Sequence, residues 1–434
     1  MLLVAPAKLN RAPRAWTAAF LAAARIAPAI GVAAESPAVA DLQLLFDQRD
    51  FFALRDSLPT VAASLQESAE IQFFRAATEQ AFNRPAASNE TLAVLLATPD
   101  LERELTLRVR HLQLTNHLRL HRYAAALESA GAIISELDEG DESPVGLDVR
   151  GKLPLLRALA DVPPQVTDVR GPSRLALGNT RRIPLTIQGT KYSFTLDTGA
   201  NFSVIRRSEA QKLGLEIRPA NLVISTSTAR KVVGDVTVAR EVEIGKIRYS
   251  NVVFLVLPDE LLSFPDGQQI QGLVGFPVVE AMGEVVFRRD NVLEIPYKPP
   301  RRAHQNLALN DLDPLVQIRY GKDSLLCRFD TGANQTVFYE PFFERYRERV
   351  ESSGHPITAK AGGVGGIQEI PSYRLPKLAL TLASAGVTLR RAEIYTVPIR
   401  SSDENYLYCN VGLDALERFR SYAINFRDMA LVLR

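Results

Sequence analysis

Two patterns of apolar residues divide the chain into a helical part and a β-rich part. From about residue 41 to 137 the apolar positions recur every three or four residues, as on the buried face of a helix. The helical segments are 42–58, 71–82, 90–97, 101–114 and 121–137. Pro59 follows the first segment and predicts its end. We therefore expect a helical bundle or a short solenoid in this region.

Two of these helices resemble a known repeat. The segments RDFFALRDSL (49–58) and HRYAAALESA (121–130) are similar to the aromatic-then-alanine helices of tetratricopeptide repeats. No regular period of about 34 residues fits the region, so a generic helical domain is the alternative.

Beyond the helices the pattern changes to strands. Residues 138–150 are acidic, contain Gly and Pro, and predict a linker. After about residue 165 the chain alternates apolar and polar residues, is rich in Val, Ile and Thr, and is punctuated by Gly. The segments 182–199 and 236–257 are examples of this pattern, which is typical of β-sheet.

The β-rich part contains an internal repeat. FTLDTGANFSVI (194–205) matches RFDTGANQTVFY (328–339), and each copy follows a short alternating hairpin. A glycine-containing apolar element comes 78 residues after Asp197, at Gly275, and 82 residues after Asp330, at Gly412. Unrelated β domains would not share this order and spacing, so we interpret the two copies as one duplicated fold.

The repeated motif resembles the retropepsin-like and pepsin-like aspartic proteases over residues 170–434. The resemblance implies a multidomain α plus all-β chain, with a helical region followed by two retropepsin-like closed β-barrel lobes that form an intrachain pseudo-dimer. The expected boundaries are a signal peptide at 1–34, a helical domain with its linker at 35–150, and lobes at 151–298 and 299–434.

The resemblance implies that Asp197 and Asp330 are the catalytic pair. Hydrolysis of an amide needs a base that activates water and an acid that protonates the leaving nitrogen. Two carboxyl groups placed about 3 Å apart share one proton, because both cannot ionise comfortably, and one pair thus supplies both functions. The protons belong to the pair, so individual roles stay open at this point.

The resemblance gives supporting roles to the three residues after each aspartate. These are Thr198, Gly199 and Ala200 in the first copy and Thr331, Gly332 and Ala333 in the second. The threonine hydroxyls are expected to lock the two loops together, and the glycines to permit close approach. Each alanine stands where pepsin-like enzymes often have Ser, and cannot donate a hydrogen bond that stabilises the carboxylate. We therefore expect a mildly acidic to neutral pH optimum.

Further elements follow from the same resemblance. The family usually has a polar residue two positions after the downstream Gly; Asp414 fits this pattern and Pro277 does not. Flap hairpins are expected at 225–236 and 359–370, and an ordinary glycine turn is the alternative for the glycine-rich run at 362–366.

Composition narrows the choice of partners. The 51 basic and 49 acidic residues give a net charge of +2, which offers no argument for a nucleic-acid partner.

His117 and His121 have the i,i+4 spacing of a metal pair on the predicted helix, but a solvated helix face is favoured and no metal site is assigned. The resemblance implies that Cys327 and Cys409 lie on neighbouring strands. We favour two reduced core thiols over a disulfide, because cysteines on neighbouring strands often fail the geometric requirements of a disulfide.

The N-terminus differs from the rest of the chain. Residues 1–34 contain no acid, and early basic residues precede an Ala-rich apolar stretch and Val32-Ala33-Ala34. This order predicts a secretory signal and an exported protein, periplasmic or secreted; an organelle transit peptide is the alternative. No later stretch of about 18 apolar residues predicts an internal membrane segment.

Together these features predict an aspartic endopeptidase that acts on a polypeptide substrate without metal or cofactor. The helical domain is expected to recruit a protein partner or to restrict access to the cleft. Three alternatives stay open: lobe pairing between chains, a non-catalytic peptide-binding protein that keeps the protease fold, and an interaction scaffold whose function lies in residues 35–160.

Overall fold

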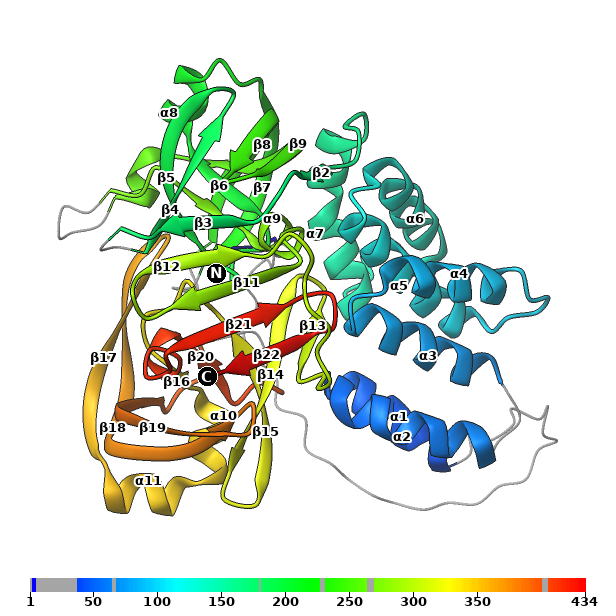
Figure 1. Cartoon of the computed structure of the whole chain (residues 1–434). Helices are drawn as coiled ribbons and strands as arrows, with labels where there is room; N and C mark the ends of the chain where they lie inside the picture. The colour runs from blue at the N-terminus through cyan, green and yellow to red at the C-terminus, as the bar shows by residue number, and fades with distance from the viewer. Residues whose placement is uncertain are drawn as a thin grey trace.

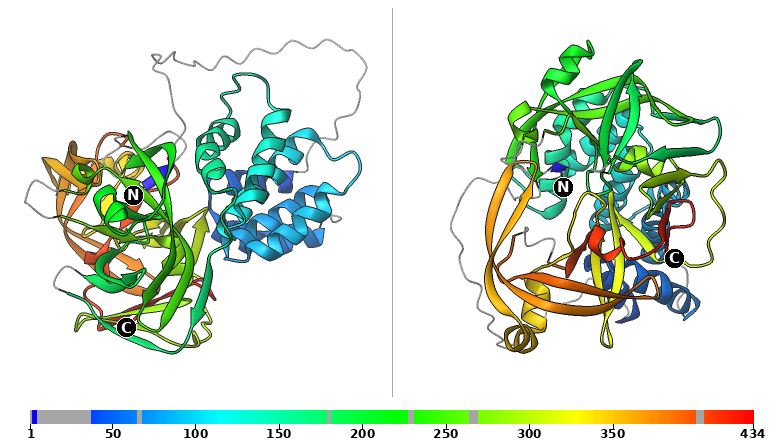
Figure 2. Two further views of the ribbon diagram at one scale, coloured as in Figure 1. Left: turned by 90° about the horizontal axis from the view of Figure 1, so that it is seen from above. Right: turned by 60° about the vertical axis from the view of Figure 1, so that its left-hand side comes forward.

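A computed structural model describes residues 2–4, 37–64, 68–178, 181–226, 231–263, 269–399 and 405–434. Within these described residues, a short N-terminal strand is followed by seven helices and then by two β-rich lobes, with the helices gathered on one side of the lobes (Figures 1 and 2). Of the predicted signal segment 1–34, only strand β1 (Leu2–Val4), which pairs with β7 (Ile217–Thr226), lies within the described residues. Among the described residues, no helix is both long and apolar enough to cross a membrane.

The helical region is a chain of helices in which neighbours in sequence pack on each other. The helices are α1 (Pro37–Asp47), α2 (Phe51–Ser64), α3 (Ala69–Ala81), α4 (Pro85–Leu96), α5 (Arg103–Arg119), α6 (Tyr123–Glu136) and α7 (Pro144–Leu159). Segment 42–58 is divided between α1 and α2, because the backbone turns at Arg49 with a φ of 56°. Pro59 lies inside α2 and does not end it. Proline costs the helix one backbone hydrogen bond, because it has no N–H. The buried side chains of Phe52 and Leu58 stabilise the helix in spite of this loss.

The predicted linker at 138–150 is wrong in its second half, because α7 begins at Pro144. The Ser143 side chain caps this helix by accepting a hydrogen bond from the Gly146 N–H at 3.1 Å. Proline suits the first helical position, where its missing N–H costs nothing. The Ser-Pro pair therefore starts a helix, and the helical region extends to Leu159.

Each lobe is a closed ring of six strands joined in the same order. The ring of lobe 1 runs β4 (Arg182–Ile187), β5 (Thr190–Leu196), β10 (Gly272–Val274), β6 (Ser203–Arg206), β9 (Ile247–Leu257) and β8 (Lys231–Ile244), which closes on β4. The ring of lobe 2 runs β14 (Asp313–Tyr320), β15 (Asp323–Phe329), β20 (Cys409–Val411), β16 (Val337–Phe338), β19 (Ala385–Tyr395) and β18 (Gly366–Leu382), which closes on β14. The predicted fold class, helices followed by two retropepsin-like lobes, is confirmed.

A five-stranded sheet joins the two lobes within one chain. Its order is β22 (Ala430–Leu433), β21 (Ser421–Asn425), β11 (Glu284–Arg288), β12 (Val292–Ile295) and β3 (Ser173–Ala176). The central pair joins β11 of the first half to β21 of the second. The buried Glu284 carboxylate accepts from the Arg302 guanidinium at 2.7 and 3.0 Å and from the Asn425 amide at 2.7 Å. Strand pairing and this charged contact hold the lobes side by side.

The helical region contacts both lobes through polar side chains. The Arg119 guanidinium, which is 1% exposed, pairs with Glu280 of α9 (Phe276–Glu280) in lobe 1 at 3.2 Å. The Asn83 amide donates to the carbonyl of Phe426 in the second half at 2.8 Å. The helices lie on the side of the lobes away from the hairpin of β17 (His355–Gly363) and β18 (Figures 1 and 2).

Candidate active site

Asp197 and Asp330 occupy matching loops, one at the end of β5 and one at the end of β15. The Asp197 N–H donates to the Val274 carbonyl on β10 at 3.0 Å, and the Asp330 N–H donates to the Val411 carbonyl on β20 at 3.0 Å. In each lobe the strand before the downstream glycine therefore fixes the start of the aspartate loop.

Four hydrogen bonds tie the two loops across the lobes. The Thr331 hydroxyl accepts from the Thr198 N–H at 3.1 Å, and the Thr198 hydroxyl accepts from the Thr331 N–H at 3.0 Å. Each hydroxyl also donates to a carbonyl in the opposite lobe, Thr198 to Phe329 at 3.4 Å and Thr331 to Leu196 at 3.2 Å. Because both threonines are buried, this reciprocal set fixes the position of one loop relative to the other.

The glycines that follow bring the two carboxyl groups together. The Gly199 N–H donates to Asp197 Oδ1 and the Gly332 N–H to Asp330 Oδ1, each at 2.8 Å. A Cβ on Gly199 would lie 2.6 Å from Cγ of Asp330, and one on Gly332 would lie 2.4 Å from Cγ of Asp197. Each glycine thus faces the carboxyl group of the other lobe, where no side chain fits.

The two carboxyl groups have different acidities. Burial and, after it, the negative charge of Asp330 raise the pKa of Asp197 to about 6. Burial would also raise the pKa of Asp330, but the Arg328 guanidinium, the Asn410 amide and the Gly332 N–H lower it below its usual value. Between these two values the pair holds one proton and one negative charge, the state that can supply an acid and a base together.

Sequence reasoning missed two polar residues beside the pair, Asn410 and Arg328. The Asn410 Nδ2 donates to Asp330 Oδ2 at 3.0 Å. The Arg328 Nη2 donates to the Gly199 carbonyl of lobe 1 at 2.9 Å, and the same guanidinium pairs with Asp313. Asn410 stands two residues before Gly412, and Arg328 stands two residues before Asp330. A position-by-position comparison of the two copies of the motif would therefore have found both residues.

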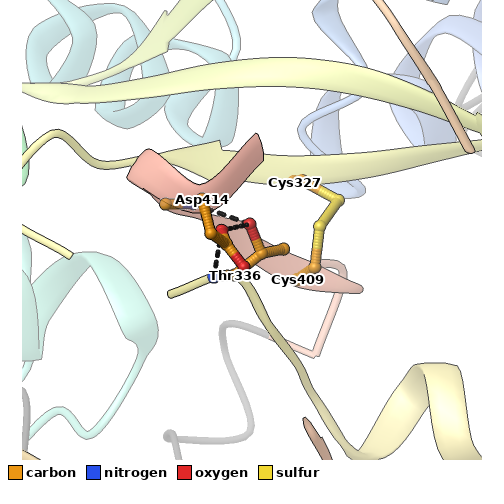
Figure 3. The surroundings of a disulfide bond; sticks show 5 residues. Cys327, Thr336, Cys409 and Asp414 are labelled. Carbon is orange, nitrogen blue, oxygen red and sulfur yellow. Dashed lines mark hydrogen bonds between the residues drawn. A yellow bond between two sulfur atoms is a disulfide. The ribbon is translucent and has the colours of Figure 1, made fainter. Parts of the chain in front are cut away.

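The serine or threonine six residues after each aspartate also has a function that sequence reasoning did not assign. In lobe 2 the Thr336 hydroxyl accepts from the Gly412 N–H at 3.0 Å and donates to Asp414 at 2.6 Å (Figure 3). In lobe 1 the Ser203 hydroxyl accepts from the Gly275 N–H at 3.1 Å. Pro277 stands at the position of Asp414 in lobe 1 and provides no carboxylate, so the side chain at this position cannot accept a hydrogen bond from the Ser203 hydroxyl.

The preference for reduced cysteines is wrong, because a disulfide joins Cys327 to Cys409 (Figure 3). The two residues are direct partners in the parallel pair of β15 and β20, and their Cα atoms are 4.7 Å apart. This spacing lies within the range that a disulfide requires. The family resemblance implied that these strands are neighbours, but the sequence did not give their register.

The expectation for His117 and His121 also needs correction. Helix α5 ends at Arg119, and His121 follows it with a φ of 57°, so the two rings do not share a helix face. His121 lies within hydrogen-bond reach of the Tyr123 hydroxyl, at 3.3 Å, and burial lowers its pKa to about 4. Both histidines are half-buried rather than solvated.

Hairpins occupy both expected flap positions. Strands β7 and β8 form the hairpin of lobe 1, whose residues 227–230 lie outside the described part of the chain. Strands β17 and β18 form the hairpin of lobe 2, with paired residues up to Gly363 and Gly366 at its tip. The side chains of Val233 and Ile367 on these hairpins are 56% and 44% exposed.

Part of the chain is similar to known proteins. The protein-family model described as aspartyl protease matches residues 183–278, which contain Asp197. A retropepsin-like aspartic protease from Rickettsia conorii is 22% identical, with a TM-score of 0.21, over 30% of this chain and 94% of that one. The EIAV protease complexed with the inhibitor HBY-793 is 18% identical, with a TM-score of 0.18, over 24% of this chain and 86% of that one. A search of curated proteins found no match. The resemblance read from the Asp-Thr-Gly-Ala motifs is confirmed for residues 183–278, which match the aspartyl protease family.

Proposed function

We propose that this chain is an aspartic endopeptidase whose single active site contains Asp197 from lobe 1 and Asp330 from lobe 2. The observation that carries the proposal is the arrangement of two buried carboxyl groups, each facing the loop glycine of the other lobe. Their unequal acidities support it further, because such a pair can accept and donate a proton in one step.

The proposed substrate is a polypeptide bound in an extended conformation between the lobes and their hairpins. An extended segment can add main-chain hydrogen bonds to a β-hairpin, as an extra strand would. The exposed Val233 and Ile367 on the two hairpins support a preference for apolar side chains in the substrate. Water activated between the carboxyl groups attacks the peptide carbonyl, and no covalent intermediate with the enzyme forms.

The test is cleavage of a mixed peptide library by the wild type, Asp197→Asn and Asp330→Asn. We expect each single variant to lose activity about 10²- to 10⁴-fold, because each removes one half of the proton transfer. Asp168→Asn is the matched control: this aspartate on β2 (Val166–Val169) has a side chain that is 59% exposed and lies outside the site. A wild type that cuts no peptide at any pH would favour the non-catalytic peptide-binding alternative.

Mixing the two inactive variants separates pairing within one chain from pairing between chains. If lobe 1 of one chain joined lobe 2 of another, a mixture of Asp197→Asn and Asp330→Asn would contain some intact sites and regain activity. If identical lobes paired between chains, each variant alone would keep an intact site. The shared sheet of β11 and β21 supports the expectation that neither occurs.

We further propose that the protein is exported to the periplasm or secreted. The order of basic, apolar and small residues at 1–34 supports this, and so does the Cys327–Cys409 disulfide, which is maintained in oxidising compartments. N-terminal sequencing of the mature protein tests it, with a start just after Ala34 as the expected result. A start at Met1 in cytosolic protein would contradict it.

A further inference from the structure

The two carboxyl groups of the dyad have unequal neighbours at one register position. Beneath Asp330, strands β15 and β20 align Arg328 with Asn410. Beneath Asp197, strands β5 and β10 align Thr195 with Leu273. The strands correspond in the two rings, so lobe 2 has a cation and an amide where lobe 1 has a hydroxyl and an alkyl group.

Asn410 acts on one carboxyl group alone. Its amide is buried and donates to Oδ2 of Asp330, while the Gly332 N–H donates to Oδ1. Both oxygens of Asp330 therefore accept hydrogen bonds. Among the described residues, the carboxyl group of Asp197 accepts one hydrogen bond, from the Gly199 N–H. A donor that is aimed at a carboxylate favours its charged form.

Arg328 acts on both carboxyl groups. Its side chain is 1% exposed, and the lobe 1 loop holds it beside the dyad through the Gly199 carbonyl. The charged groups around Asp330 in the described part of the chain are Asp197 from lobe 1, Arg328 on β15 and Asp313 on β14, which pairs with Arg328. The guanidinium lowers the pKa of Asp197 as well as that of Asp330, so it does not by itself decide which of the two is charged.

We propose that Asn410 is a positioning residue that fixes the negative charge of the dyad on Asp330 and thereby assigns the two roles. This inference rests on the proposed peptidase function. In the first step a proton of water passes to Asp330 while the water oxygen bonds to the peptide carbonyl carbon, and the proton of Asp197 passes to the carbonyl oxygen. In the second step the C–N bond breaks: the nitrogen takes the proton from Asp330, and one hydroxyl of the intermediate returns its proton to Asp197.

Asn410 in lobe 2 and Leu273 in lobe 1 occupy corresponding positions. The test gives each position the residue of the other lobe and follows the pH profile of kcat/KM. Asn410→Leu gives lobe 2 the residue of lobe 1. Because Asn410 stabilises charged Asp330 in the singly and doubly ionised dyad alike, its loss should raise only the first ionisation. We expect the acidic limb to move up by about one pH unit and the basic limb to stay in place.

Leu273→Asn is the matched control in lobe 1. The new amide would favour charged Asp197, which exists only in the doubly ionised dyad. The basic limb should therefore move down, by about one pH unit, while the acidic limb stays in place. An acidic limb that is unmoved in Asn410→Leu, with an active enzyme, would overturn the inference and leave the peptidase function intact.

Carbon-13 titration of the carboxyl groups gives the same information without catalysis. In wild type we expect Asp330 to ionise before Asp197, and in Asn410→Leu its midpoint should rise. Asp197 ionising first in wild type would overturn the inference, even if Asn410→Leu failed to fold. A wild type with the expected titration order but no cleavage would remove the proposed function and keep the assignment of charge.

Discussion

Lobe 1 and lobe 2 share the backbone of the aspartate loop but place different chemistry on the two strands beneath it. In lobe 1 the Phe194 ring covers Gly272, and a Cβ at that glycine would lie 2.4 Å from the ring. In lobe 2 the corresponding residues are Cys327 and Cys409, joined as a disulfide. One residue further along each strand, Thr195 pairs with Leu273 in lobe 1, whereas Arg328 pairs with Asn410 in lobe 2.

The difference follows from what each residue contacts. The Thr198 and Thr331 hydroxyls bond to each other's backbone across the lobes, so a change in one loop disturbs the other. The strands beneath pair within their own lobe and can differ without breaking that symmetry. A pair of carboxyl groups that needs one proton and one charge benefits from such a difference, since equal surroundings would leave the charge on either aspartate.

The disulfide gives the largest expected difference between the lobes. Cys327→Ala combined with Cys409→Ala should lower the free energy of unfolding by about 4 kcal/mol, because the bond closes a long loop in the unfolded chain. The two cysteines are 82 residues apart. Denaturant titration measures the change, and reductant should lower the midpoint of wild type but not that of the double variant. Equal wild-type midpoints with and without reductant would contradict the expectation.

The loop glycines should show how far the two lobes are alike. Gly199→Ala and Gly332→Ala each place a Cβ within 2.6 Å of the opposite carboxyl group. We expect each to lower kcat/KM at least about 100-fold, because displacement of a reacting group by about 1 Å has that effect. Gly386→Ala on β19 is the control, since a Cβ there meets nothing within 4 Å. A large difference between the two loop variants would show that the loops are not equivalent.

The Thr336 and Ser203 hydroxyl groups, which accept from the downstream glycines, should contribute unequally to the free energy of unfolding. Thr336→Val removes the acceptor for the Gly412 N–H and one of the donors to Asp414, and should cost about 2 kcal/mol of unfolding free energy. Ser203→Ala removes only the acceptor for the Gly275 N–H and should cost about 1 kcal/mol. Thermal or denaturant unfolding compares the two. A larger effect for Ser203→Ala would contradict the view that lobe 2 is more strongly braced.

The pH profile of kcat/KM of the wild type should show one limb from the aspartate of each lobe, with a smaller effect than the substitutions above. Activity needs Asp330 charged, which is lost as the pH falls through its lowered pKa, and Asp197 protonated, which is lost as the pH rises through about 6. We expect a maximum of kcat/KM between about pH 4 and 6 and a loss of about tenfold one unit above the upper pKa. An optimum below about pH 3 would contradict it.

The sequence predicted the parts of the site that depend on backbone geometry. Two Asp-Thr-Gly-Ala loops with a downstream glycine at nearly equal spacing predicted two matching rings. The flap hairpins were also expected where they occur, because strand alternation and turn glycines are local signals. Helix α7 was missed because the acidic, Gly- and Pro-containing segment 138–150 was interpreted as a linker, whereas Ser143 and Pro144 start a helix.

The contacts between strands could not be predicted in the same way. Asn410 is an ordinary polar residue in the sequence, and only the register of β20 against β15 directs its amide to Asp330. The same register joins Cys327 to Cys409, whereas the general geometry of neighbouring strands favoured free thiols. Arg328 would be costly to bury without partners, and the tertiary structure supplies them from the loop of lobe 1 and from Asp313.

The sequence by itself thus determined where the two Asp-Thr-Gly-Ala motifs lie and that the fold occurs twice, because short motifs and alternation depend on local backbone preferences. The tertiary structure decided which carboxyl group has the stronger donors, that the lobes join within one chain, and that the helices contact both of them. These features depend on strand register and on contacts between distant segments, where a shift of one residue turns a side chain to the opposite face.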